Sequence, residues 1–410
     1  MFPTAPTAII AVFTPENSPL DGALKPILLR GDMDALPMAG SPEEGRTVGT
    51  SIQEGCHMPG SAISHSHATT TSDQPSIKDA SQLHHGCGHD GHTAMMLITA
   101  HWIQENQDKV HRKVVVFFQP AEEARRESDN MSGAEVVIRE GLFEAHPDIH
   151  AVYGVHGGPG MPVGNFLTGK SAMMAGSGGF TIAIDGTGGH AANPGREQSE
   201  PLLAASAIVT CGQTIIARRF EPNNAGVLAF CVVDTLGATA GNVCPGKVEV
   251  RGSIRAFNDK DWDYIADELG RISKHIGEAY NCKAEFFPSK GYPVTTNSPH
   301  AGEISYNAAA TVLKDNKSLN VYTVGYGVGE VPPATGSEDF SYLLLCRPGA
   351  FAFLSIGDDF TTMHTPEVKF PAEALKYGGR YFREIVVGPD CTDPLPPPSI
   401  QVLPGEPMKS

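Results

Sequence analysis

The sequence lacks a long apolar run and an excess of positive charge, and each absence excludes a class of protein. No stretch approaches the ~20 apolar residues that cross a bilayer. The 46 Asp and Glu residues outnumber the 30 Lys and Arg residues, for a formal net charge of −16, which argues against nucleic acid or membrane as the main partner. The apolar patch at residues 9–13 has no basic residue before it, so it does not resemble a secretory signal. We therefore expect a soluble, cytoplasmic protein.

Closely paired cysteines are also missing. The eight cysteines are widely and irregularly spaced, with no CxxC pair, which is not the pattern of a disulfide framework in a chain of this size. Most of them are expected to be small buried side chains. Cys87 is the exception, because it lies within a run of histidines.

Apolar residues make up 40% of the 410 residues, enough for a large core in two or three domains. Short apolar runs predict strands at 8–13, 26–30, 113–119, 151–156, 180–186, 226–233, 247–257, 284–287 and 350–357. Amphipathic stretches predict helices at 93–107, 133–144, 200–219, 261–280, 300–314, 337–345 and 372–387. This alternation predicts an α/β fold, with a smaller α/β sandwich inserted in the chain. Residues 39–85 predict a long surface loop.

The stretch HHGCGHDGH at residues 84–92 carries four histidines, a thiol and a carboxylate beside a predicted helix. Imidazole and thiolate are ligands for zinc and other transition metals, and the glycines let the backbone turn so that side chains converge. A polar loop with chance histidines is the alternative. The buried strand at 113–119 ends before Glu122 and Glu123, of which one can ligate a metal while the other acts as general base. The alternative there is a solvated pair that opens a helix.

Three further strand ends carry possible ligands or supporting groups. Asp32 and Asp34 alternate along the chain, so both face one side of an extended strand. Asp34 is suited to orient a ligating histidine, although an Asx turn is the alternative. His156 and His364 lie near the ends of two other predicted strands and are candidate ligands. Two metals ~3.5–4 Å apart need about five protein ligands, and five are available: Cys87, His89, Glu123, His156 and His364.

These motifs resemble the aminoacylase and carboxypeptidase-like clan of binuclear metallopeptidases, and within it the amidohydrolase branch. That branch includes hippurate hydrolase, N-acyl-amino-acid amidohydrolases and the auxin-conjugate hydrolases. The matching stretches, in order, are LLRGDMDALPM (28–38), HGCGHDGHTAMML (85–97), VVVFFQPAEEA (114–124), YGVHGGPGMPVG (153–164), GTGGHAANP (186–194), GNVCPGKVEVRGSIRAF (241–257), GSEDFSYLL (336–344) and MHTPEVKF (363–370).

The resemblance implies a role for each candidate residue. Metal ligands would be Cys87, His89, Glu123, His156 and His364, with Glu122 as general base. Asp34 would orient a ligand, His190 would hold the scissile carbonyl oxygen, and Asn242 would bind the substrate carboxylate. The ions would be two divalent metals per chain, of zinc, manganese, cobalt or nickel.

The resemblance also implies a metal-dependent exopeptidase-like catalytic domain, residues 1–170 with 286–390, and a satellite dimerisation domain, 171–285, followed by a Pro-rich tail, 391–410. The expected activity is hydrolysis of the amide bond of small N-acyl amino acids by a homodimer. A dipeptidase of the same clan and a non-catalytic binding descendant are the alternatives. The sequence departs from the family after Glu123, where ARRESDN replaces a glycine-rich segment, and at Gly195, where relatives usually carry His. Two further departures are a short segment before residue 30 and a longer loop before Cys87.

Overall fold

The computed structural model describes residues 2–15, 24–37, 83–126, 129–193, 195, 198–359, 363–365 and 367–397. The chain forms two compact units. The first contains residues 1–173, 295–332 and 339–410, and the second contains 174–294 and 333–338. The α/β fold class is confirmed, whereas the predicted domain boundaries stay a prediction. Most of the predicted loop at 39–85, and the tail beyond residue 397, lie outside the described residues.

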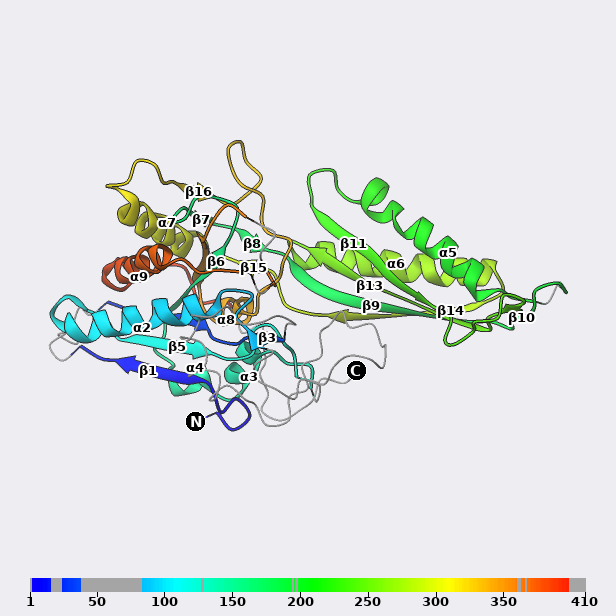
Figure 1. Cartoon of the computed structure of the whole chain (residues 1–410), viewed down its shortest axis with the longest axis horizontal. Coiled ribbons are helices and arrows are strands. Elements are labelled where there is room, and N and C mark those ends of the chain that lie inside the picture. Colours follow the sequence, from blue (N-terminus) through cyan, green and yellow to red (C-terminus); the bar gives the residue numbers. More distant parts are fainter. Residues whose placement is uncertain are drawn as a thin grey trace. The chain divides into compact units, whose positions relative to one another are not determined.

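The first unit is built on a seven-stranded sheet with the order β1-β5-β2-β6-β17-β7-β16 (Figure 1). Strands β5, β2, β6 and β17 run parallel to one another, β1 is antiparallel to β5 at one edge, and β7 is antiparallel to β17. All residues of β2 and β5 are buried, so both faces of the sheet must be covered. The strand bounds are β1 Ile9–Phe13, β2 Ile27–Asp32, β5 Val114–Gln119, β6 Ala151–Gly158, β7 Phe166–Thr168, β16 Val321–Thr323 and β17 Gly349–Ser355.

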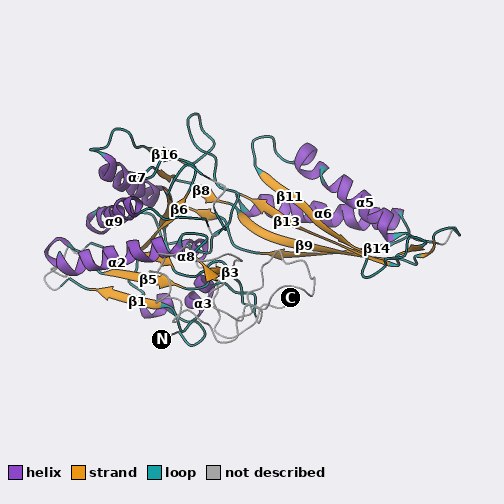
Figure 2. Ribbon diagram, viewed as in Figure 1, coloured by secondary structure: helices purple, strands orange, loops and turns teal. Residues whose placement is uncertain are grey.

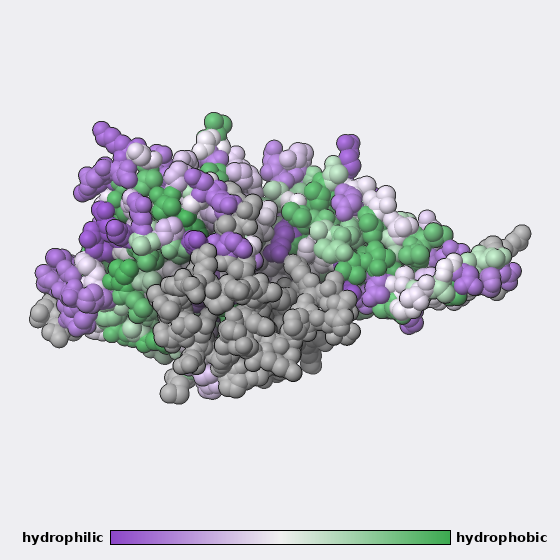
Figure 3. Space-filling model, viewed as in Figure 1, coloured by the Kyte–Doolittle hydropathy of each residue, from purple (hydrophilic) through white to green (hydrophobic). Residues whose placement is uncertain are grey.

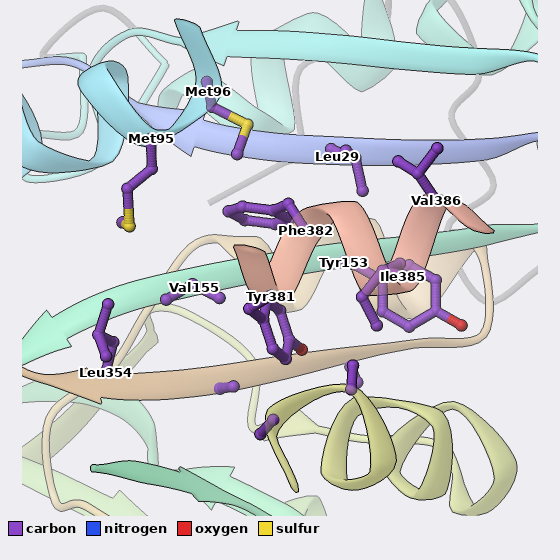
Figure 4. Close-up of a cluster of buried hydrophobic side chains, with 14 of the residues drawn as sticks. Leu29, Met95, Met96, Tyr153, Val155, Leu354, Tyr381, Phe382, Ile385 and Val386 are labelled. Atoms are coloured by element: carbon purple, nitrogen blue, oxygen red, sulfur yellow. The ribbon is translucent and has the colours of Figure 1, made fainter. Parts of the chain in front are cut away.

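Two groups of helices pack on this sheet. Helices α2 (His89–Glu105), α7 (Pro299–Leu313) and α9 (Ala372–Val387) share one apolar cluster with the strands. Figure 4 shows side chains of α2, α9, β2, β6 and β17 meeting there. Helix α8 (Phe340–Cys346) contacts α3 (Gly133–Arg139), β6 and β17. The first unit also contains α4 (Leu142–Ala145), a 3₁₀ turn (Gln107–Lys109), and the strands β3 (Leu36–Pro37), β4 (Leu83–His84) and β15 (Thr295–Thr296).

The second unit is a four-stranded antiparallel sheet, β11-β13-β9-β14, with two helices on one face (Figure 2). From Phe180 onward, buried and partly buried residues alternate along β9, as expected for a sheet with one face packed on a core. Phe180 and Ile182 of β9 pack under Leu269 of α6 in this core, while Phe287 of β14 is exposed. The bounds are β9 Gly176–Asp185, β11 Gly226–Asp234, β13 Lys247–Ala256, β14 Lys283–Lys290, α5 Pro201–Gly212, a π-helix Ile215–Arg219 and α6 Asp259–Ala279.

One helical stretch of the described residues, Pro201–Arg219, is long and apolar enough to cross a membrane by length and composition alone. It packs on β13 and α6 and places Ala204, Ala205 and Ile208 in the core of the second unit. A core helix passes the same test. The remaining short strands are β8 (Ala172–Met174), and β10 (Gly189–His190) paired with β12 (Val243–Cys244). The seven cysteines within the described ranges form no disulfide.

Candidate metal centre

The candidate ligands of the first unit follow the carboxyl ends of its central parallel strands. β2 ends at Asp32, β5 ends at Gln119 just before the Glu122–Glu123 pair, and β6 carries His156 near its end. Parallel strands present their carboxyl ends at the same edge of a sheet, which is where open α/β folds build their sites. Positions 34, 123 and 156 are therefore brought to one edge, and His89, the first residue of α2, reaches the same place through its contact with Asp34.

The donor atoms of the five predicted ligands lie close together. Atoms of Cys87, Glu123 and His364 are all within 4.8 Å of one another. The sulfur of Cys87 lies 3.5 Å from Nε2 of His156. Oε1 of Glu123 lies 3.2 Å from Nε2 of His364 and 3.9 Å from Nε2 of His89. The structure thus gathers sulfur, nitrogen and oxygen donors in one place, which is the chemistry of a transition-metal site.

Asp34 braces two of these residues at once. Its Oδ1 lies 3.2 Å from Nδ1 of His89, and its Oδ2 accepts a 3.0 Å hydrogen bond from the backbone N–H of Glu123. A proton on Nδ1 of His89 leaves Nε2 with a lone pair directed at the cluster. This is the usual arrangement of a carboxylate behind a metal-binding histidine.

Nε2 of His89 is a buried ring nitrogen with no hydrogen-bond partner among the described residues. It lies 3.5 Å from Oδ2 of Asp32, close to the Glu123 carboxylate. Buried polar atoms are nearly always satisfied, so an orphaned donor or acceptor indicates a missing partner. A divalent cation between His89 and Glu123 satisfies both groups.

The electrostatics of the cluster favour a positive charge. Burial disfavours the charged ring of His89, yet the Asp32 carboxylate raises its pKa well above the usual value. Hydrogen bonds to Cys87 and Glu123 raise the pKa of His364 to about 10. Burial would raise the pKa of Glu123, but its hydrogen bond to His364 and the charge of His89 lower it to about 2. The acidic groups of the cluster thus favour protonated rings at His89 and His364. A metal ion bound at these rings would displace those protons.

Sequence reasoning noted Asp32 and His92 without assigning them a role, and the structure places both in the centre. One oxygen of Asp32 contacts Nδ1 of His92 and the other accepts a 2.9 Å bond from Arg30. Arg30 is buried and also bonds Gln119 and Asp339, each at 2.9 Å. Nε2 of His92 accepts a 2.7 Å bond from the backbone N–H of Gly157. Both nitrogens of His92 are therefore occupied, so it supports the centre rather than ligating within it.

Three backbone positions at the centre adopt the left-handed conformation. Gly88 has φ 83° between Cys87 and His89, and it also precedes the first residue of α2. Ala121 has φ 55° immediately before the glutamate pair, and His364 has φ 58°. Non-glycine residues rarely adopt this conformation unless the surrounding structure enforces it, and such residues cluster at functional sites.

Gly133, the first residue of α3, holds the Ala121 turn in place. Its N–H donates a 2.8 Å bond to the carbonyl of Ala121. A Cβ added to Gly133 would lie 1.7 Å from the carbonyl oxygen of Pro120. The turn that presents Glu122 and Glu123 can therefore keep its position only if residue 133 is glycine.

We accordingly predict that Gly133→Ala shifts the glutamate pair and lowers kcat/KM by about 100-fold, since displacements of ~1 Å have effects of that size. Steady-state kinetics of the folded variant checks this. Gly179→Ala in β9 is the matched control, because its Cβ would meet nothing closer than 3.6 Å. Equal activity of the two variants would contradict the prediction.

The other two predicted site residues lie in the second unit. His190 is exposed at the end of β10, and its Nδ1 accepts a 3.1 Å bond from the N–H of Ala192. The carbonyl of Asn242 accepts a 3.0 Å bond from the N–H of Ala191. The two residues are thus neighbours across the short β10–β12 ribbon, and their roles stay predictions.

Comparison with known proteins identifies the family to which this fold belongs. Residues 28–387 match the model of peptidase family M20/M25/M40. The chain belongs to this family. It is 28% identical over 393 residues to the IAA-amino acid hydrolase ILR1-like 2 of Arabidopsis thaliana, spanning 94% of this chain and 76% of that protein. It is 31% identical over 280 residues to the N-acetyl-L-cysteine deacetylase of Bacillus subtilis, spanning 68% of this chain and 62% of that protein.

A solved structure supports the same fold for this M20 chain. The YXEP protein of Bacillus subtilis, a dinuclear metal-binding peptidase from the M20 family, superposes with a TM-score of 0.67 at 23% identity, covering 93% of this chain and 84% of that one. The predicted resemblance to the amidohydrolase branch is thereby confirmed. Family membership places the chain among the metal-dependent hydrolases that act on amide bonds.

Proposed function

We propose that this M20 protein hydrolyses the amide bond of N-acyl amino acids with two divalent metal ions, of zinc, manganese, cobalt or nickel. The observation that carries the proposal is the buried, unpartnered Nε2 of His89, which lies among the donors of Glu123 and the neighbouring ligand candidates. Cys87, His89, Glu123, His156 and His364 would hold the metals. Bound divalent ions supply a Lewis acid and lower the pKa of water to about 7.

Glu122 is the residue that we propose to move the proton. It is buried, and a carboxylate oxygen lies within 4.8 Å of donor atoms of His89 and Glu123. From that position it takes a proton from the attacking water and delivers it to the leaving amine. Asp34 keeps His89 and Glu123 in place during the reaction. In the second unit, His190 is proposed to stabilise the developing oxyanion, and Asn242 to bind the substrate carboxylate.

The substrate class is supported by the names of two relatives, a hydrolase of IAA-amino acids and a deacetylase of N-acetyl-L-cysteine. We expect the metal-loaded protein to release amino acid from N-acetyl, N-benzoyl or indole-acetyl amino acids. The assay measures the freed amine across a panel that also contains dipeptides. Hydrolysis confined to dipeptides would favour the dipeptidase, and metal binding without turnover of any substrate would favour a non-catalytic binding protein.

We also propose that the protein forms a homodimer through the second unit. Figure 3 shows apolar surface on the second unit. The exposed apolar side chains of this unit include Leu203, Val233 and Phe287. Strands β11 and β14 are the edges of its sheet, and an unpaired edge is a surface on which another chain can pair. The mass of the protein in solution tests this.

A further inference from the structure

We propose that His92 is a positioning residue that fixes the ring orientation and the proton location of His156 through the backbone of Gly157. This inference rests on the proposed ligand set, in which His156 binds a metal. It concerns a residue whose own nitrogens are both occupied, and which therefore acts through another residue.

The two hydrogen-bond partners of His92 determine which of its ring nitrogens carries the proton. A carboxylate oxygen only accepts hydrogen bonds, so Nδ1 of His92 donates to Asp32. A neutral imidazole has one donor and one acceptor. Nε2 of His92 must then accept, and it does so from the N–H of Gly157 at 2.7 Å. Both contacts specify the same tautomer.

The backbone of Gly157 in turn determines the tautomer of His156. The carbonyl of Gly157 lies 2.9 Å from Nδ1 of His156, and a carbonyl also only accepts. Nδ1 of His156 is therefore the protonated nitrogen, and its Nε2 has a lone pair, 3.5 Å from the sulfur of Cys87. The N–H of Gly157 belongs to the peptide group that joins it to His156, and its carbonyl belongs to the next peptide group. His92 therefore holds the first of these two groups, the carbonyl of the second holds the ring of His156, and the two meet at the Cα of Gly157.

The side chains around His92 hold it in a fixed position. His92, Asp32 and Arg30 are each at most 1% exposed, and Arg30 clamps Asp32 from behind at 2.9 Å. The ring of Phe370 packs edge-on against His92, with centroids 5.8 Å apart. A Cβ on Gly157 would lie 2.4 Å from that ring. The backbone of Gly157 is therefore held by the ring of Phe370 and by His92, and of these two contacts only the one to His92 is a directional hydrogen bond.

The test measures the affinity of the purified protein for Zn²⁺ by competition with a chromophoric chelator. His92→Phe keeps an aromatic ring and removes both hydrogen bonds. We expect it to weaken one of the two bound ions by about 10–100-fold, the range typical of residues behind a ligand, while the other ion is held within about threefold. His92→Gln retains an amide oxygen that can accept from Gly157, and we expect it to recover part of the loss. Thr99→Val, which removes a buried hydrogen bond farther along α2, should leave both affinities unchanged.

The inference is overturned if His92→Phe binds both ions as tightly as the wild type. It is also overturned if both ions weaken equally together with the melting temperature of the metal-free protein, since that is general loss of structure. Should His92→Phe fail to fold, His92→Asn replaces it, because Asn can donate to Asp32 but does not reach Gly157. Equal affinities of the Asn and Gln variants then overturn the inference. A wild type that binds no Zn²⁺ overturns the proposed function itself, whereas a wild type with two ions and unaffected variants overturns the role of His92 alone.

Discussion

Replacing Glu122 with Gln is expected to lower kcat by about 10²–10⁴-fold, the range typical of a lost general base, while the protein still binds two metal ions. The amide of Gln has nearly the shape of the carboxylate, so the buried position at 5% exposure is preserved. What is lost is the ability to accept a proton from water and return it to the leaving amine. Kinetics on the best substrate of the panel, with metal content measured on the same sample, checks this.

Glu123→Gln is the natural comparison, because the two residues are adjacent in the same turn. Oε1 of Glu123 lies 3.2 Å from His364 and 3.9 Å from His89, so we expect this variant to lose both metal and activity. Activity that survives in Glu122→Gln, or metal that is lost from it, would show that the two glutamates have been assigned in the wrong order.

Removal of the metals is expected to abolish hydrolysis and to destabilise the first unit. An ion that binds only the folded state contributes about 2.7 kcal/mol when its free concentration is 100 times its dissociation constant. Without it, the carboxylates of Asp32, Asp34 and Glu123 repel one another more strongly. Treatment with a chelator should therefore lower the melting temperature, and excess Zn²⁺, Mn²⁺, Co²⁺ or Ni²⁺ should restore stability and activity.

Two histidines of α2 provide a matched pair for this experiment. His89→Ala removes a donor at the centre, and we expect the variant to behave like the chelated protein even in excess metal. His101→Ala removes an exposed histidine of the same helix, whose side chain is 73% exposed, and should respond to chelation and reloading as the wild type does. Full activity in the chelated wild type would rule out metal-dependent chemistry.

The sequence predicted the long elements of this fold because their periodicity is strong, and it missed what depends on local backbone geometry. Helix α2 was expected to begin near residue 93, since the glycines before it suggest a loop. It begins at His89, because Gly88 adopts a left-handed conformation and starts the helix. The helix expected over 133–144 is divided at Gly141, which has φ 98°. Strands β7 and β16 are three residues long and have no readable alternation.

The candidate ligands could be chosen from the sequence because their residue types and motifs are characteristic. Most of the groups that hold these ligands in place through hydrogen bonds could not be chosen in this way. Asp34 has a recognisable place two residues after Asp32. The role of His92 depends on the N–H of Gly157, a backbone group from a distant strand. The identities of residues 92 and 157 do not predict this hydrogen bond, because every residue except proline has a backbone N–H. The contact can be found only in the folded structure.

The pairing of Arg30 with Asp339 has a consequence for how the chain folds. The two residues are 309 positions apart in sequence, and their contact closes a very long loop. The chain loses conformational entropy when it closes such a loop, and the contact contributes favourable free energy only after closure. Contacts of this kind therefore form slowly. During synthesis, Arg30 and Asp32 are made long before Asp339 emerges, so the charged centre of the sheet stays solvated until nearly the whole chain is available. A chain interrupted before residue 339 therefore cannot complete this buried network. We expect tight metal binding only after the network has formed, so that metal binding marks the end of folding.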